Sequence, residues 1–304
     1  MRTKIDINKL ILNPLNLFII PGMIYLIINN YIPMVGVLIA FKQVDYSVGI
    51  FWSEWIGLEN FKFLFASRDA FIITRNTLLY NLAFIGLGTF LGLVSGIFLS
   101  EIASKACQKV YQTIILFPQL FSIIIVAYIV VGFLSTDAGF INNSVFGPER
   151  TVNFYTESVY WPFLLTFIHL WRGLGYNSII YLSAIVSVDK NLYESATIDG
   201  ANRLQQVFNV TIPTIKPTIT TLILIGVGRI FYTDFGLFYQ VPMNSGRLFN
   251  VTNTIDTYTF RGLMQFNNIA LSSAAGTYQA IVGLIIILTV NGLVRKFDRD
   301  NAMF

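Results

Sequence analysis

The sequence predicts an all-α protein that crosses a membrane six times, and three observations carry this prediction. Apolar residues make up 55% of the 304 residues and charged residues only 12%, about half the ~25% of a typical soluble domain. Six long apolar stretches recur along the chain with shorter polar passages between them. One polar passage in the second half carries a helix–glycine–helix pattern. We therefore expect one membrane domain, residues 1–304, with little soluble mass.

Each predicted span is an apolar run long enough to cross the hydrocarbon core with some tilt. Pro21 and Pro33 fall in the first run and predict a kink there. In the second run, Gly88, Gly92 and Gly96 recur every four residues, and we expect them to pack within the chain rather than at a subunit interface. The spans are predicted at residues 15–41, 77–102, 110–134, 159–186, 218–239 and 277–294.

The connecting segments are polar and differ in character. The first loop, residues 42–76, contains Trp52 and Trp55, which suit a membrane interface. A tight turn is expected at residues 103–109, and further polar loops at residues 135–158 and 240–276. The single cysteine, Cys107, excludes an intramolecular disulfide.

The polar passage at residues 191–217 reads as two short amphipathic helices with a turn between them. Asp199-Gly200 forms the turn, where glycine adopts positive φ without strain. Pro213 and Pro217 mark the start of the next helix. The apolar positions of the two helices are Leu192, Ala196, Leu204, Val207 and Phe208. This apolar face needs a partner, which is the membrane surface, the protein's own spans or another protein.

The distribution of Lys and Arg predicts the sidedness of the loops. Six spans place both termini on one side, together with the 103–109 turn and the 191–217 passage. Lys and Arg are denser on that side than on the other, so it is predicted to be cytoplasmic. The cationic residues of that side are Arg2, Lys4, Lys9, Lys105, Lys109, Lys190, Arg203, Lys216, Arg295, Lys296 and Arg299.

The sequence contains no recognisable catalytic motif. It has no phosphate-binding P-loop, its only histidine is His169, and no paired-carboxylate or nucleophile motif is present. We expect no catalytic residues, no bound metal or cofactor, and no nucleic-acid partner, because no basic cluster occurs. The protein therefore moves or holds a molecule rather than transforming it.

Ionisable residues within predicted spans are the candidates for substrate contact, because a charge in a bilayer is costly and usually faces a cavity. His169, Arg172 and Tyr176 share one helical face, and Tyr232 lies three residues beyond Arg229. Aromatic rings beside hydrogen-bonding groups suit a sugar, and an arginine also pairs with the carboxylate of an acidic sugar. The alternative is that these residues reach the interface or seal contacts between helices. The predicted substrate contacts are Arg172, Tyr176, Arg229 and Tyr232.

The 191–217 passage resembles the "EAA" loop of permease subunits in binding-protein-dependent ABC importers of the maltose type. The matching positions are Glu194, Ala196, Asp199, Gly200, Ala201, Phe208, Pro213 and Pro217, and Ser195 replaces the second letter of the pattern. The resemblance implies that this loop couples the permease to a cytosolic ATPase. The implied coupling residues are Leu192, Tyr193, Glu194, Ala196, Asp199, Gly200 and Ala201.

Both ends of the chain resemble oligosaccharide and polysaccharide permeases of the LplB-like branch, in residues 21–34, 276–283 and 291–297. The resemblance implies import of oligosaccharides, acidic or polysaccharide-derived ones among them, by ATP-driven alternating access in a bacterial cytoplasmic membrane. Its implied partners are a second, different permease, ATPase subunits that use ATP and Mg, an extracytoplasmic solute-binding protein, the sugar and membrane lipid. The alternatives are a permease for another solute and a membrane scaffold without a pore.

Overall fold

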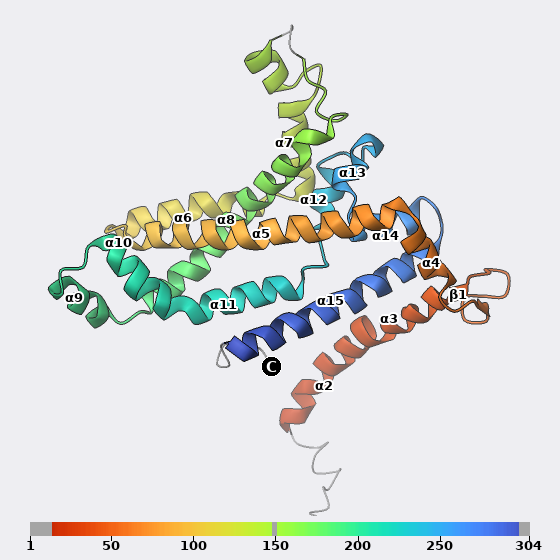
Figure 1. The fold of residues 1–304 in the computed structure, drawn as a ribbon, viewed down its shortest axis with the longest axis horizontal. Helices are drawn as coiled ribbons and strands as arrows, with labels where there is room; N and C mark the ends of the chain where they lie inside the picture. The colour runs from red at the N-terminus through yellow and green to blue at the C-terminus, as the bar shows by residue number, and fades with distance from the viewer. Residues whose placement is uncertain (1–13, 148–150, 298–304) are drawn as a thin grey trace, which may run out of the picture. The chain divides into compact units, whose positions relative to one another are not determined.

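The computed structural model describes residues 14–147 and 151–297 and confirms the all-α class (Figure 1). Arg2, Lys4, Lys9 and Arg299, which enter the sidedness prediction, lie outside the described residues. The chain forms two compact units, residues 1–67 with 259–277 and residues 68–258 with 278–304. Each unit is described by itself.

The first unit begins with a helical stretch that changes its winding around Pro33. A π-helical turn lies directly before Pro33 and a 3₁₀ stretch follows it. Proline lacks the N–H of a regular helical turn and its ring crowds the preceding turn, so altered winding replaces the ideal α-helix here. The consecutive elements are α2 (Pro14–Leu26), η1 (Ile27–Tyr31), α3 (Ile32–Met34) and η2 (Val35–Phe41).

A small antiparallel hairpin follows, formed by β1 (Lys42–Gln43) and β2 (Glu54–Trp55). The Lys42 ammonium is buried, donates to the carbonyls of Phe51 and Ser53, and lies over the Trp55 ring. The Ser47 hydroxyl and N–H donate to the Asp45 carboxylate and lower the pKa of that group. The hairpin leads into α4 (Glu59–Ala66), whereas the sequence predicted one irregular loop over residues 42–76.

The second unit is built on α5 (Arg68–Ser100) and α8 (Trp161–Val186). The glycine stripe of α5 packs on α8, which confirms packing within the chain. A Cβ at Gly92 would lie 2.8 Å from Cβ of Asn177, and one at Gly96 would lie 2.9 Å from Cβ of Tyr181. Glycine therefore permits the backbone of α5 to approach α8.

The third predicted span, expected as one helix over residues 110–134, is two helices with a bend of 91° between them. They are α6 (Lys105–Leu120) and α7 (Ile123–Leu134). Pro118 in the last turn of α6 favours the break, and the Ser122 hydroxyl caps α7 by accepting a hydrogen bond from the Ile125 N–H. The first turn of α6 also shortens the predicted 103–109 turn.

The fifth predicted span, residues 218–239, is likewise divided. α11 (Ile212–Gly228) ends at Gly228, and α12 (Phe235–Gln240) begins after an irregular segment, residues 229–234, here named the break. Asp234 caps α12 by accepting from the Leu237 N–H at 3.2 Å. The predicted 240–276 loop is largely helical, because it contains η7 (Gly246–Leu248), α13 (Phe249–Thr252), α14 (Ile255–Met264) and the start of α15 (Ile269–Phe297).

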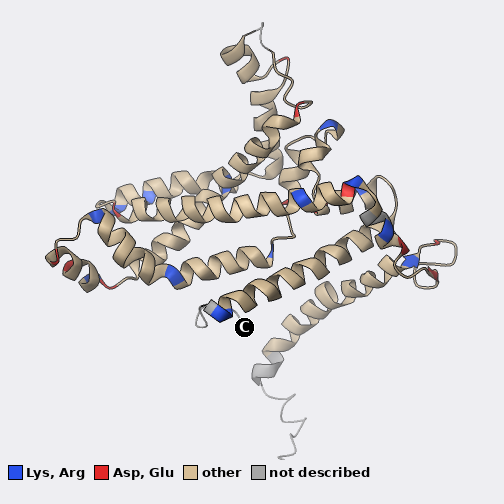
Figure 2. Ribbon diagram, in the orientation of Figure 1, with Lys and Arg blue, Asp and Glu red and all other residues tan. Residues whose placement is uncertain are grey.

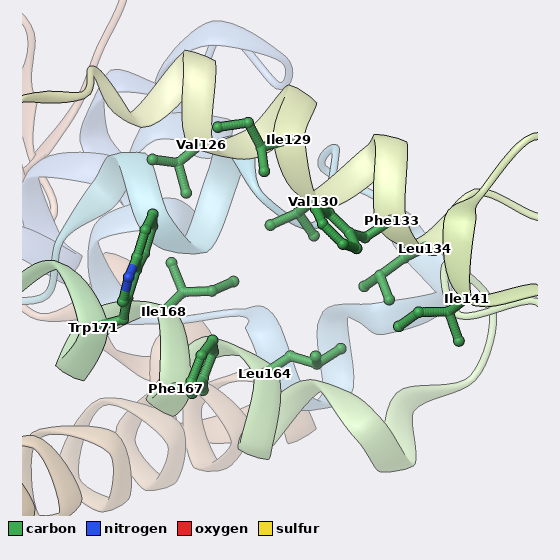
Figure 3. Close-up of a pocket in the computed structure, with 10 residues that line it drawn as sticks. All are labelled: Val126, Ile129, Val130, Phe133, Leu134, Ile141, Leu164, Phe167, Ile168 and Trp171. Atoms are coloured by element: carbon green, nitrogen blue, oxygen red, sulfur yellow. The ribbon is translucent and has the colours of Figure 1, made fainter. Parts of the chain in front are cut away.

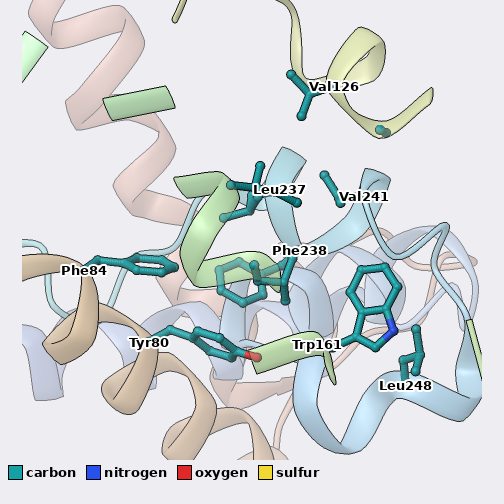
Figure 4. Close-up of a cluster of buried hydrophobic side chains, with 11 residues drawn as sticks. Tyr80, Phe84, Val126, Trp161, Leu237, Phe238, Val241 and Leu248 are labelled. Carbon is teal, nitrogen blue, oxygen red and sulfur yellow. The ribbon is translucent and has the colours of Figure 1, made fainter. Parts of the chain in front are cut away.

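A hydrophobic cluster anchors α12 against α5 and α8 (Figure 4). Phe238 of α12 meets the Tyr80 ring edge-on at a centroid distance of 4.7 Å. Trp161, at the start of α8, is fully buried and donates its indole N–H to the Phe154 carbonyl. The cluster fixes the C-terminal end of the break, because α12 follows directly after the break.

The described helices support a membrane protein. Four of them are long and apolar enough to span a bilayer, or five if α6 and α7 count as one broken span. α8, with 26 residues, has the length but is not among these, and it carries His169 and Arg172. Figure 2 shows long uncharged stretches along the helices, with charges mainly near helix ends and in connections. The count of six spans stays a prediction.

Candidate substrate cavity and coupling loop

A polar cavity of about 640 Å³ opens between α5, α8, α11 and the break. Its walls mix hydroxyl, amide, imidazole and guanidinium groups with aliphatic side chains. The polar residues that line it are Asn81, Thr89, His169, Tyr176, Asn177, Tyr181, Arg229, Tyr232, Thr233 and Asp234. A cavity of this composition, inside a unit of membrane-length helices, fits a polar solute better than a lipid tail.

The break exposes backbone carbonyls, and Asn81 of α5 satisfies two of them. Its amide donates to the carbonyls of Ile230 at 2.8 Å and Tyr232 at 3.1 Å. Non-helical backbone within a membrane is tolerated only where protein or a water-filled cavity surrounds it. Asn81 therefore holds the break in place at the cavity wall.

The other side of the break is held by Asp256 and Gln279. The Asp256 carboxylate accepts from the N–H and the hydroxyl of Thr233, both at 2.7 Å. Gln279 donates to the Phe231 carbonyl at 2.6 Å and to Asp256 at 3.1 Å. Side chains from α5, α14 and α15 thus define the course of the break, so the groups it presents to the cavity are preorganised.

Arg172 of α8 is engaged inside the protein. Its Nη1 lies 3.4 Å from Oδ2 of Asp234, and its buried Nε has no hydrogen-bond partner among the described residues. Asp234 therefore both caps α12 and neutralises Arg172. Of the two predicted intramembrane arginines, this one has a structural counter-charge.

Arg229 differs from Arg172 in this respect. It is the C-cap residue of α11, it lines the cavity, and among the described residues it has no ion-pair partner. Tyr176 and Tyr232, with 60% and 45% of their surface exposed, line the same cavity. The structure thus brings Tyr176, Arg229 and Tyr232, three of the four predicted contacts, together at one cavity. The fourth, Arg172, is linked to this cavity by its ion pair with Asp234.

Sequence reasoning missed several residues of the cavity. Asn81 and Asn177 were not among the predicted substrate contacts, and neither was His169, which was placed on the helical face of Arg172 and Tyr176. The His169 ring stacks on Phe84 at a centroid distance of 3.7 Å. A signal was available for Asp234, since an acidic residue five positions after Arg229 is unusual inside an apolar run.

A second pocket, of about 310 Å³, lies between α7 and α8 and is entirely apolar (Figure 3). Aliphatic and aromatic side chains of the two helices point toward one another across it. They include Val126, Ile129, Val130 and Phe133 of α7 and Leu164, Phe167, Ile168 and Trp171 of α8. No polar surface faces this pocket, so it offers a sugar no hydrogen bond.

The predicted helix–turn–helix passage is present as α9 (Lys190–Ile198) and α10 (Arg203–Gln206), followed by the π-helical η6 (Val207–Thr211). Gly200 has φ of +82°, which confirms the predicted backbone conformation. Asp189 caps α9 by accepting a hydrogen bond from the Asn191 N–H. Asn202 and Gln205 form a reciprocal capping box at α10.

The predicted coupling residues point in different directions. Tyr193 turns inward, packs against the cluster that includes Tyr181 and Ile185, and hydrogen-bonds the Thr211 hydroxyl at 3.0 Å. Leu192 and Glu194 are exposed, as are Asp199 and Gly200, while Ala196 is half-buried and Ala201 lines a cleft between α9 and α10. Ile198, missed from the sequence, is 86% exposed. The outer surface of α9 is thus mainly polar, with two exposed apolar side chains, Leu192 and Ile198.

The helices, the broken span beside a polar cavity and the exposed helical loop define a membrane transport protein. The family model described as binding-protein-dependent transport system inner membrane component matches residues 88–301, which is most of the chain. The chain therefore belongs to this family of ABC importer permease subunits, whose role is transport and not catalysis.

Two relatives from Bacillus subtilis (strain 168) extend over nearly the whole chain. The polygalacturonan/rhamnogalacturonan transport system permease protein YteP is 33% identical over 288 residues, covering 94% of this chain and 89% of its own. Protein LplB is 30% identical over 287 residues, covering 94% and 90%.

A solved structure agrees with this chain in fold. One chain of a bacterial ABC transporter involved in the import of the acidic polysaccharide alginate has a TM-score of 0.84 and 32% identity, covering 93% of this chain and 96% of its own. The alginate transporter in complex with an alginate pentasaccharide-bound periplasmic protein matches with a TM-score of 0.83 and 33% identity.

Proposed function

We propose that this permease imports acidic oligosaccharides and that Arg229 binds a substrate carboxylate in the polar cavity. The observation that carries the proposal is the contrast between the two arginines. Asp234 neutralises Arg172, whereas Arg229 lines the cavity without an internal counter-ion among the described residues. A guanidinium and a carboxylate form a strong, charge-assisted pair, and a sugar acid supplies the missing anion.

The remaining cavity groups fit the rest of a sugar. Tyr176 and Tyr232 offer rings for the apolar C–H faces, and Asn177, Thr89 and Tyr181 offer hydrogen bonds to hydroxyls. The relatives support the class, because polygalacturonan is a polymer of uronic acid and alginate is named as acidic. A neutral solute would leave the charge of Arg229 without a counter-ion.

The proposed cycle is alternating access. A solute-binding protein delivers the sugar at the outer face, and closure of cytosolic ATPase subunits, which use ATP and Mg, reorients the helices around the cavity. In this proposal α9 docks on the ATPase through Leu192 and Ile198, with Glu194 meeting a basic group. Both termini lie in the cytoplasm, and a second, different permease completes the pore.

The test compares an acidic oligosaccharide with its carboxyl-reduced, neutral form. Arg229→Gln should lower transport efficiency for an oligogalacturonide by about tenfold or more, the factor expected for a lost hydrogen bond to a charged group. It should change transport of the reduced sugar much less, and Arg229→Lys should retain part of the acidic preference. Equal losses for both sugars would show that Arg229 is structural.

The double variant Arg172→Gln with Asp234→Asn is the matched control, since it removes the same positive charge from the neighbouring helix without leaving an unpaired carboxylate in the cavity wall. Because Arg172 pairs with Asp234 and not with the substrate, loss of this pair should affect both sugars alike. A selective loss for the acidic sugar in the double variant would transfer the carboxylate-binding role to Arg172.

A further inference from the structure

We infer that the groove beside Arg75 is a binding site for an anionic phospholipid. The groove has a volume of about 400 Å³ and lies between the N-terminal part of α5, the start of α8 and α13. Its walls include Leu79, Ala83, Pro162, Thr166 and Val251, and Arg75 is its one charged residue. The inference requires only that the chain spans a membrane and does not rest on the proposed substrate.

The Arg75 guanidinium is fixed along one edge and open along the other. Nε and Nη2 donate to Oδ1 of Asn76, at 3.2 and 2.9 Å, and Nη2 also donates to the Asn250 carbonyl at 2.6 Å. The ring of Phe71 lies 5.8 Å from the guanidinium carbon. Among the described residues Nη1 has no acceptor and Arg75 has no carboxylate partner. A preorganised cation with two free N–H groups suits a phosphate oxygen.

The depth of Arg75 in the membrane matches a phosphate. α5 continues for 25 residues from Arg75 to Ser100, or about 38 Å at 1.5 Å per residue. Glu101 follows α5 and pairs with Arg203 of α10 at 3.6 Å, which places the helical loop at that end. A bilayer with its headgroups is about 40–45 Å thick. Arg75 therefore reaches the headgroup level of the opposite leaflet.

The apolar walls continue from Arg75 toward the membrane interior. Arg75, Leu79 and Ala83 are spaced i, i+4 and i+8 and share one face of α5, and Pro162 and Thr166 repeat this spacing on α8. The two faces form a track about 12 Å long beneath the cation. The acyl chain of a lipid fits this track while the lipid phosphate accepts hydrogen bonds from Nη1. A sugar would find few hydrogen-bonding partners along the same walls.

The site should favour a lipid with net negative charge. Because no described carboxylate neutralises Arg75, a phosphatidylglycerol headgroup compensates the charge, while phosphatidylcholine brings its own cation to the same place. The other candidate occupant of the groove is a helix of a second permease. If such a helix fills the groove, the importer should show no preference between the two lipids.

The experiment is native mass spectrometry of the assembled importer titrated with phosphatidylglycerol or phosphatidylcholine. In the wild type, one phosphatidylglycerol should bind about tenfold or more tightly than phosphatidylcholine. Arg75→Gln should abolish this difference and Arg75→Lys should retain part of it. Arg247→Gln is the control, since Arg247 is exposed and lies outside the groove.

Leu79→Trp provides a second variant that leaves Arg75 and its hydrogen bonds intact. Leu79 is 58% exposed, so the larger ring should fill the track without disturbing the core and should displace the lipid. Unchanged phosphatidylglycerol affinity in both Arg75→Gln and Leu79→Trp would overturn the inference. Equal affinity of the wild type for the two lipids would overturn it as well.

Discussion

The two sides of α8 form cavities of opposite character. One side contributes Tyr176, Asn177 and Tyr181 to the polar cavity, and the other contributes Phe167 and Ile168 to the apolar pocket against α7. In a bilayer an apolar pocket costs little, because lipid tails fill it, whereas every polar group away from water needs a partner. A charged group without a counter-ion among the described residues of the first side is therefore informative, and Arg229 is such a group.

The contrast between the two sides of α8 matters for transport if ATP hydrolysis reorganises the polar cavity. A substitution in the turn between α9 and α10 tests this coupling and should have the largest effect. Gly200→Val places a β-branched residue at φ of +82°, which strains the backbone although no atom lies near the new Cβ. We expect the ATPase to detach or to hydrolyse ATP without transport, while the permease still inserts. The measurement is pull-down of the ATPase together with transport-coupled hydrolysis. Wild-type behaviour would show that α9 is not the coupling element.

Substitutions in the Arg172–Asp234 pair should have the next largest effect. Asp234→Ala removes both the cap of α12 and the counter-charge of Arg172, and should destabilise the complex by about 2–3 kcal/mol. Asp234→Asn keeps a capping oxygen and should cost less. Thermal unfolding of the purified complex measures both.

The Arg172→Gln background distinguishes the two roles of Asp234. Adding Asp234→Asn there should cost little, because no charge is left unpaired. A full, additive loss in the double variant would mean that the 3.4 Å pair contributes nothing to stability.

The wall of the polar cavity gives a smaller, graded effect. Gly92→Leu should press on Asn177 and Tyr181, cost about 1–3 kcal/mol by overpacking, and reduce the cavity. Gly86→Leu on the same helix is the control, since nothing lies within 4 Å of its Cβ position. Thermal stability and sugar transport should fall for Gly92→Leu alone; equal effects of the two variants would contradict the close packing.

The apolar side should respond least. Ile129→Phe adds bulk to a pocket of about 310 Å³ and should shift stability by less than about 1 kcal/mol, with no change in preference between acidic and neutral sugars. Competition between the two sugars in transport measures this preference. A change in preference would mean that the sugar also contacts the apolar side, and the contrast between the two sides of α8 would fail.

The sequence predicted most readily what depends on neighbouring residues. The α9–α10 passage follows from Asp199-Gly200, the apolar spacing and the prolines that follow, all within a short stretch. The altered winding before Pro33 also has a local cause. The glycine stripe at Gly88, Gly92 and Gly96 was correctly assigned to packing inside the chain, because small residues every four positions have a direct steric meaning.

The parts that sequence reasoning missed depend on contacts between distant segments. Asn81 lies about 150 residues from the carbonyls it satisfies, so nothing near it in the chain marks its role. The break was assigned to a continuous span because hydropathy averages over Arg229 and Asp234. Ser122 was overlooked as the start of α7, since a serine within an apolar run is common and becomes a cap only where the helix bends.

The ties across the break also determine which parts of the chain travel together. Asn81 joins the break to α5, and Asp256 with Gln279 joins it to α14 and α15, so these five hydrogen bonds resist its separation from these elements. In any rocking movement that opens the cavity, the break therefore moves together with α5. The Arg172–Asp234 pair, at 3.4 Å, is a longer tie that joins the break to α8, so a movement of α8 against the break must open this ion pair first.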